Sequence, residues 1–159
     1  MENGSNFPAS WSYASNNPSN TNYQFDWSTE AASSGTHSLK ITSSINNGPN
    51  FGYWYQTVSY ANPGKTVQLS VKIKIVNVIA ANPGIGASIA LAGFSGSDQT
   101  QFVSSGNATP IVGTSDWSIY TVKISNIASG TDKLVVYLPL GTQTTGTVYF
   151  DEVSLKEVN

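Results

Sequence analysis

The stretch TVQLSVKIKI, residues 66–75, alternates polar and apolar side chains without interruption. Because successive side chains of a β-strand point to opposite faces, its aliphatic residues share one face and its polar residues share the other. One buried and one solvated face are typical of a strand in an antiparallel sheet. Residues 66–75 therefore predict a long strand that covers one side of a core.

Weaker versions of this pattern recur along the chain, separated by clusters of Gly, Pro and Asn such as Asn62-Pro63-Gly64. No segment has the apolar spacing of a helix. The further segments that predict strands are residues 37–41, 51–58, 86–94, 117–124, 133–138 and 147–155. After a loop-rich region over residues 1–35, we expect an all-β fold. It is an antiparallel β-sandwich (jelly roll) of two sheets, with roughly eight or nine short strands and almost no helix.

The composition narrows the possible partners. The chain has 159 residues, which predicts a single domain over 1–159. Only 10% of the residues are charged, and the lysines and acidic residues balance to a net charge of −2. A basic surface for nucleic acid or for an anionic membrane is therefore absent. With 23 Ser, 15 Thr and 15 Asn, the surface suits neutral, hydroxyl-rich ligands.

Groups for catalysis are scarce. There is one histidine, His37, at the start of a predicted strand, and there is no cysteine. Most carboxylates lie in predicted turns, and no glycine-rich phosphate loop or metal triad is present. We therefore expect the chain not to be an enzyme. The first residues have no signal-peptide pattern, and no apolar run approaches the ~20 residues of a membrane span. We interpret the chain as a module of a longer secreted protein.

Five stretches occur in the order seen in extracellular carbohydrate-binding modules, and the sequence resembles families 16, 4 and 22 of that group. They are Asn3–Phe7 with Trp11, Ser34–Ile41, Gln56–Val58 with Asn62–Ser70, Gly113–Trp117, and Val148–Leu155. Two positions depart from the pattern: Pro8 replaces an acidic residue, and Val67 replaces an aromatic one. The resemblance implies a jelly roll that binds sugar without catalysis, attached to a glycoside hydrolase in a bacterial secreted chain.

The resemblance also implies a structural calcium where the N-terminal segment, the turn around Gly35 and the last strand meet. Calcium takes six to eight oxygen ligands, many of them backbone carbonyls. Asp151 is also notable by itself, because it is a carboxylate within an otherwise apolar strand. The positions that match the family's ligands are Asn3, Ser5, Gly35, Ser38, Lys40 and Asp151.

A sugar site needs flat aromatic side chains beside amides that hydrogen-bond hydroxyl groups. If Val58 faces the core, Trp54 shares its side, and Tyr53 and Tyr55 point outward. Tyr137 matches a position at which family 16 modules carry a binding aromatic. The expected sugar-binding residues are Trp27, Tyr53, Tyr55, Gln99, Gln101 and Tyr137, with Trp11, Tyr23 and Gln143 as weaker candidates.

The expected ligand is a neutral β-1,4-linked polysaccharide or oligosaccharide of the cellulose, glucomannan or mannan type, held in a shallow cleft across a concave sheet. The low net charge leaves no field to attract an acidic polymer. The expected partner is a parent multidomain enzyme, with the module itself monomeric. The alternatives are a structural or adhesive β-sandwich spacer of a surface protein and, third, a small catalytic jelly roll.

Overall fold

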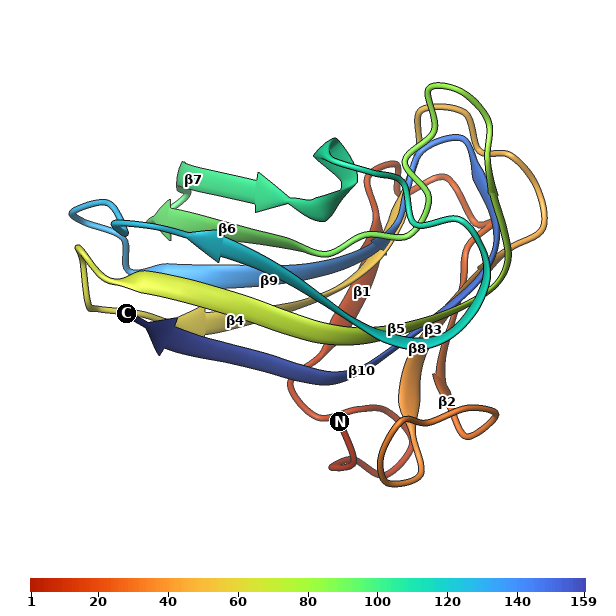
Figure 1. Ribbon diagram of the computed structural model, residues 1–159, viewed down its shortest axis with the longest axis horizontal. Helices are drawn as coiled ribbons and strands as arrows, with labels where there is room; N and C mark the ends of the chain where they lie inside the picture. Colours follow the sequence, from red (N-terminus) through yellow and green to blue (C-terminus); the bar gives the residue numbers. More distant parts are fainter.

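The computed structural model describes residues 1–159, which form a β-sandwich of two five-stranded antiparallel sheets (Figure 1). The first sheet has the strand order β1-β4-β9-β6-β7, and the second has the order β2-β3-β10-β5-β8. The strands are β1 Ser12–Ser15, β2 Gln24–Ser28, β3 Ser38–Ser43, β4 Gly52–Ser59, β5 Thr66–Ala80, β6 Ala90–Ser95, β7 Asp98–Ser104, β8 Gly113–Ile124, β9 Lys133–Leu140 and β10 Thr144–Val158. One short 3-10 helix, η1 Ser105–Asn107, follows β7.

The connections are those of a jelly roll. Only β2–β3 and β6–β7 are both consecutive in sequence and hydrogen-bonded to each other. At its other connections the chain crosses from one sheet to the other, as it does in double-sheet Greek-key folds. The all-β sandwich predicted from the sequence is confirmed, and no helix is long or apolar enough to span a membrane.

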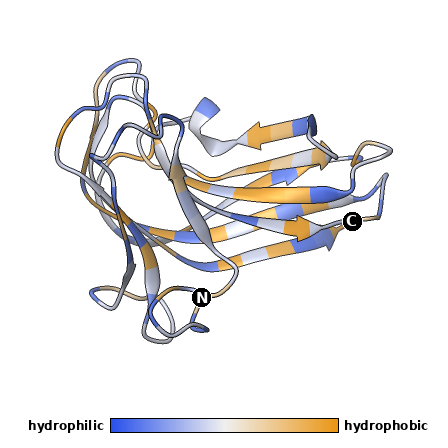
Figure 2. Ribbon diagram, turned by 180° about the vertical axis from the view of Figure 1, so that it is seen from behind, coloured by the Kyte–Doolittle hydropathy of each residue, from blue (hydrophilic) through white to orange (hydrophobic).

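The alternating stretch 66–75 opens β5, a strand of 15 residues that pairs with β8 on one side and with β10 on the other. The aliphatic side chains within residues 66–75 face inward and are at most 2% exposed. Apolar and polar segments alternate along the strands of both sheets (Figure 2). Burying only the apolar face fixes the register, because a slip by one residue would expose every aliphatic side chain.

The space between the sheets holds one core of 24 buried residues. Trp54 on β4 is fully buried there, and its indole Nε1 donates to the Lys40 carbonyl at 3.1 Å. Because strand side chains alternate, a buried Trp54 turns both of its neighbours on β4 to the outside. The core thus determines which aromatic side chains of β4 reach solvent.

Three strands lie in segments that the sequence pattern did not predict as strands: β1, β2 and β7. Each is at the edge of its sheet, and each is short. Edge strands are commonly short or rich in polar residues, which weakens the sequence signal for a strand. In β7, for example, DQTQFVS, the only exposed large apolar side chain is Phe102. Residues 1–35 are loop-rich as expected, but they also contain β1 and β2.

Candidate functional site

Three tyrosine side chains lie together on the outward face of the first sheet. Tyr55 on β4 pairs with Tyr137 on β9, and Tyr53 pairs with Pro139. The ring centroids of Tyr53 lie 5.8 Å from Tyr55 and 5.5 Å from Tyr137, the latter in an edge-to-face contact. Aromatic pairs favour such separations and edge-to-face geometry, so each ring holds its neighbour in place.

A groove of about 340 Å³ lies beside these rings. Its floor carries the small side chains of Ser88 and Ala90, which are 2% and 3% exposed because the taller side chains around them cover them. Tyr53 and Tyr137 flank the floor on one side, and Phe102 of β7, which is 51% exposed, flanks it on the other. The alternation of large and small outward residues on neighbouring strands produces the hollow.

The groove contains neutral polar groups with no hydrogen-bond partner in the protein. The side chains of Gln99 and Asn107 and the Ser88 hydroxyl line it without a partner inside the chain. No carboxylate, histidine or lysine lines it. Burial raises the pKa of Tyr53 and of Tyr137 above the ordinary value, so both phenols stay protonated through the neutral range. The groove therefore offers aromatic faces and uncharged hydrogen-bonding groups.

Four of the six sugar-binding residues expected from the sequence lie on this face. Tyr53, Tyr137 and Gln99 line the groove, and Tyr55 packs against Tyr53 beside it. The structure places them on three strands, β4, β9 and β7, that are brought together by the pairing of the first sheet.

Gln101 points away from the groove. Its amide donates to the Asn126 carbonyl at 3.3 Å and accepts from the Ala128 N–H at 2.9 Å. A bulge in the β6–β7 pairing, where Gly93 faces Gln101 and Phe94 faces Gln99, inserts one extra residue between the two glutamines. The extra residue turns them to opposite faces. We therefore correct the expected set by removing Gln101.

Trp27 lies on the second sheet, away from the tyrosines. It stacks on the His37 ring at a centroid distance of 4.0 Å, and its indole nitrogen donates to the Met1 carbonyl at 3.0 Å. The weaker candidates Trp11 and Tyr23 are 7% and 6% exposed and belong to the core. Sandwich geometry places β2 in the opposite sheet from β4, so Trp27 is also removed from the set.

Other groove residues were not expected from the sequence: Phe51, Ile85, Ser88, Phe102 and Asn107. They come from β7, η1 and loops, whose residues show no periodic pattern. Of these residues, only Phe102 carried a sequence signal, because it is a large apolar side chain within a polar segment.

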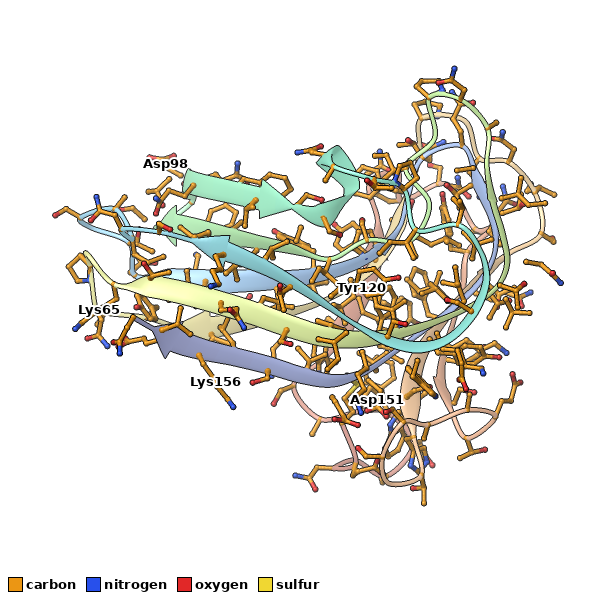
Figure 3. The ribbon with its side chains drawn as sticks, in the orientation of Figure 1. Lys65, Asp98, Tyr120, Asp151 and Lys156 are labelled. Atoms are coloured by element: carbon orange, nitrogen blue, oxygen red, sulfur yellow. The ribbon has the colours of Figure 1, made fainter.

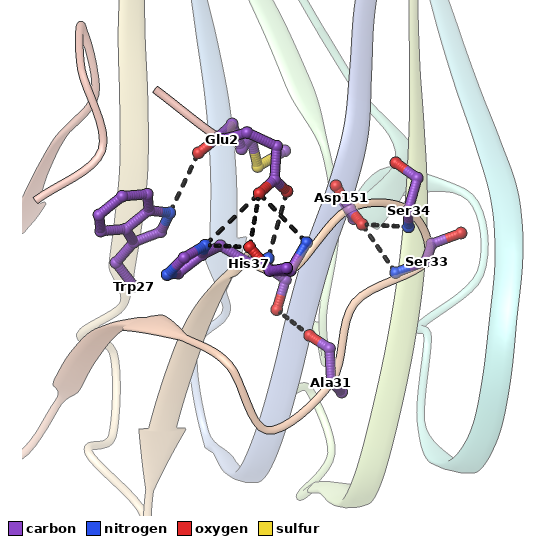
Figure 4. Close-up of polar contacts among 10 residues, drawn as sticks. Glu2, Trp27, Ala31, Ser33, Ser34, His37 and Asp151 are labelled. Atoms are coloured by element: carbon purple, nitrogen blue, oxygen red, sulfur yellow. Dashed lines mark hydrogen bonds and ion pairs between the residues drawn. The ribbon is translucent and has the colours of Figure 1, made fainter. Parts of the chain in front are cut away.

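A second polar cluster surrounds Asp151, on the far side of the sandwich from Asp98 of β7 (Figure 3). Asp151 is 3% exposed. Its Oδ2 accepts from the backbone N–H groups of Ser33 and Ser34 at 2.7 and 3.0 Å, and its Oδ1 accepts from the Glu152 N–H at 2.7 Å (Figure 4). Backbone donors thus satisfy the carboxylate and tie the β2–β3 loop to β10.

Glu2 makes a similar contact with the same loop. Its carboxylate accepts from the N–H groups of Thr36 and His37 at 3.1 and 3.2 Å and from the Thr36 hydroxyl at 2.9 Å (Figure 4). These backbone hydrogen bonds lower the pKa of Glu2 to about 2, and the bond from the Thr36 N–H contributes most. Gly35 has φ +64°, and a Cβ there would overlap the Glu2 carboxylate. We call Glu2, Asp151 and the loop residues 33–37 the carboxylate clamp.

The calcium ligands expected from the resemblance do not fit a calcium site in this geometry. The groups that face Asp151 are N–H donors, whereas calcium needs oxygen atoms. In the stretch Gly35–Lys40, expected to contribute backbone oxygens, the Lys40 carbonyl already accepts from the Trp54 indole Nε1 at 3.1 Å. The Asn3 carbonyl accepts from the Ala9 N–H at 2.7 Å, and Ser5 is exposed. No group of three His, Cys, Asp or Glu side chains is placed to hold a metal.

Several solved structures share the fold. A family 16 carbohydrate-binding module is 23% identical, covers 85% of this chain and 86% of its own, and has a TM-score of 0.55. A family 61 module solved with β-1,4-galactotriose is 13% identical, covers 94% of this chain and 90% of its own, and has a TM-score of 0.56.

An enzymatically active domain of a tailspike protein from bacteriophage CBA120 also matches. It is 10% identical over 94% of this chain, with a TM-score of 0.66, and this chain spans 20% of its length. No protein-family model and no curated protein sequence matches the chain. At these identities the likeness shows the fold, the jelly roll that the resemblance implied.

Proposed function

We propose that the chain is a non-catalytic carbohydrate-binding module whose ligand site is the tyrosine-lined groove of the first sheet. One observation carries the proposal: Tyr53, Tyr55 and Tyr137 are packed together on an outward sheet face, beside neutral polar groups that have no partner in the protein. Aromatic side chains of this size are usually buried, so three on one outward face need a reason.

Sugar rings match both kinds of group in the groove. A pyranose presents an apolar C–H face, which stacks on an aromatic ring, and a rim of hydroxyl groups, which hydrogen-bond amides and hydroxyls. The side chains of Gln99, Asn107 and Ser88 are placed to serve the hydroxyls, and the tyrosine rings serve the C–H faces. Because no charged group lines the groove, we propose a neutral ligand.

The proposed ligand is a β-1,4-linked polysaccharide of the cellulose, glucomannan or mannan type. Such chains are flat, with equatorial substituents, and suit several neighbouring ring platforms. The family 61 module with the same fold was solved with β-1,4-galactotriose, which supports a β-1,4 linkage. The resemblance to families 16, 4 and 22 supports a carbohydrate ligand in general and does not name the sugar.

The groups that line the groove support binding without catalysis. Glycoside hydrolysis uses a pair of carboxylates on either side of the bond that breaks. The groove holds none, and its tyrosines remain protonated. A site of this kind acts by holding substrate near another active site. We therefore propose that the module belongs to a longer secreted chain with a glycoside hydrolase and works as a monomer.

Affinity electrophoresis tests the proposal against soluble cellulose derivatives, glucomannan, mannan, xylan and an α-glucan. We expect retardation in gels that contain a neutral β-1,4-linked polymer and none in the α-glucan gel. A protein that migrates unchanged in every gel would contradict the proposal and would favour the alternative of a structural spacer. Retardation by the α-glucan alone would contradict the proposed linkage.

A further inference from the structure

Ile85 lines one end of the groove, where η1 and the segment after β9 lie close to it. A Cβ added at Gly106 of η1 would lie 2.5 Å from Ile85 Cγ2, and one added at Gly141 after β9 would lie 2.7 Å from Ile85 Cβ. The Ile85 side chain therefore fills the gap between these two segments. The loop that carries it is fixed, because the Ile85 N–H donates to the Thr142 carbonyl at 3.2 Å and the Gly141 N–H donates to the Gly86 carbonyl at 2.8 Å.

The sides of the groove direct a ligand toward this end. Tyr137 lies on β9 and Phe102 on β7, with β6 between them, so the two walls are about 10 Å apart at two strand spacings. The floor between them, Ser88 and Ala90, follows the course of the chain into β6. Figure 1 shows η1 at the same end of the sandwich as the loops that join β5 to β6 and β9 to β10.

The groove is also small. Its volume of about 340 Å³ lies at the low end of the roughly 300–1,000 Å³ typical of ligand sites. An open cleft that holds a polymer interior needs room for a row of sugar rings and two open ends. A small channel blocked at one end by Ile85 would have room for the last rings of a chain.

The end of the groove at Ile85 carries groups suited to a terminal sugar. Asn107 and Ser88 lie there beside Ile85, and their side chains have no partner in the protein. A terminal ring has a hydroxyl group at the position where an internal ring forms its glycosidic bond. That hydroxyl can hydrogen-bond Asn107 or Ser88, whereas a chain continuing beyond this ring would meet Ile85.

We infer that Ile85 closes one end of the groove, which therefore recognises an end of the polysaccharide chain and not its interior. This inference rests on the proposed function and specifies which part of the ligand the site takes. It predicts that the number of binding sites on a polymer follows the number of chain ends and not its mass.

Calorimetry tests this inference by comparing soluble glucomannan before and after limited cleavage by an endo-acting glycanase. We expect the moles of protein bound per gram to rise in proportion to the number of ends. An unchanged or lower number, with affinity retained, would show binding to interiors and overturn the inference while carbohydrate binding stands. No binding to either sample would overturn the proposed function as well.

Two modified ligands identify which end of the polysaccharide chain the groove recognises. Reduction of the reducing end of mannohexaose to the alditol, or methylation of O4 at its non-reducing end, alters one end at a time. We expect one of the two changes to weaken binding at least tenfold. If both modified hexaoses bind as the unmodified one does, the inference is wrong.

The variant Ile85→Ala removes the barrier. We expect it to bind uncleaved glucomannan at more sites per gram than the wild type, so that cleavage raises the number bound less steeply. Ile119→Ala, at a 64% exposed isoleucine on the second sheet, is the matched control and should behave as the wild type. If Ile85→Ala keeps its fold by thermal melting and the full dependence on chain ends, Ile85 does not close the groove and the inference fails.

Discussion

The groove and the carboxylate clamp hold their polar groups in opposite states. In the clamp, each carboxylate oxygen of Asp151 already accepts a backbone N–H, and Glu2 accepts three donors. In the groove, the side chains of Gln99, Asn107 and Ser88 have no partner in the protein. Polar groups that are satisfied internally contribute to stability, and those left open next to aromatic rings are available to a ligand. The sequence analysis expected a ligand in both regions, and the hydrogen bonds distinguish them.

The largest expected effect is on stability, in the clamp. Asp151→Ala removes a 3% exposed carboxylate and leaves the N–H groups of Ser33 and Ser34 without their acceptor. Hydrogen bonds to a charged group contribute about 1.5–3 kcal/mol each, so we expect the free energy of unfolding to fall by about 3 kcal/mol. Urea unfolding measures this, with Asp151→Asn as the isosteric control that loses less. The sugar affinity of the folded variant should be unchanged. A loss of affinity would show that the clamp also contributes to sugar binding.

The second effect is on binding, in the groove. Tyr137→Ala removes a ring that packs on Tyr53, and we expect affinity for mannohexaose or cellohexaose to fall by about 2 kcal/mol, roughly thirtyfold. The free energy of unfolding should change little, because the ring faces outward. Trp27→Phe is the control for an aromatic change outside the groove. Wild-type affinity in a folded Tyr137→Ala protein would show that the site is elsewhere.

A smaller effect concerns acid stability. Hydrogen bonds hold the pKa of Glu2 at about 2, below the value of about 4.3 for an unfolded chain. A lowered pKa in the folded state stabilises the protein above the unfolded pKa, and this stabilisation is lost as the pH falls from about 4.3 to about 2. Melting curves of the wild type and Glu2→Gln should therefore differ at pH 6 and converge near pH 2. A constant difference across this range would show that the Glu2 charge does not contribute.

The smallest expected effect is that of a chelator. Because backbone N–H groups already satisfy Asp151, we expect exhaustive metal removal to leave the melting temperature unchanged. A melting temperature that falls with the chelator, and that Asp151→Ala makes insensitive to it, would restore the calcium site implied by the resemblance. It would also make the clamp a ligand site like the groove.

The sequence predicted the parts of the molecule that depend on a strand's own alternation. The alternation in residues 66–75 predicted β5. The same reasoning placed Trp54 in the core and Tyr53 and Tyr55 on the outward face, as the structure has them. Gln101 was misassigned because a bulge changed the alternation of β7, and a bulge depends on the partner strand.

The remaining differences depend on how distant segments meet. Trp27 was misassigned because its position depends on which sheet β2 joins. Ile85 and Asn107 reach the groove through loop and 3-10 geometry, which no period in the sequence encodes.

The long pairing of β10 determines how the module responds to mechanical force. β10 has 15 residues; it pairs with β5 in three stretches separated by two irregularities, and with β3 over residues 146–150. Tension at Val158 directed along the axis of β10 would load several of these hydrogen bonds at once in shear, whereas tension directed across the sheet would break them one after another. A partner domain pulled by moving fluid or by its own substrate would thus transmit its load to the strongest part of the sandwich. The groove lies on the first sheet, to which β10 does not belong.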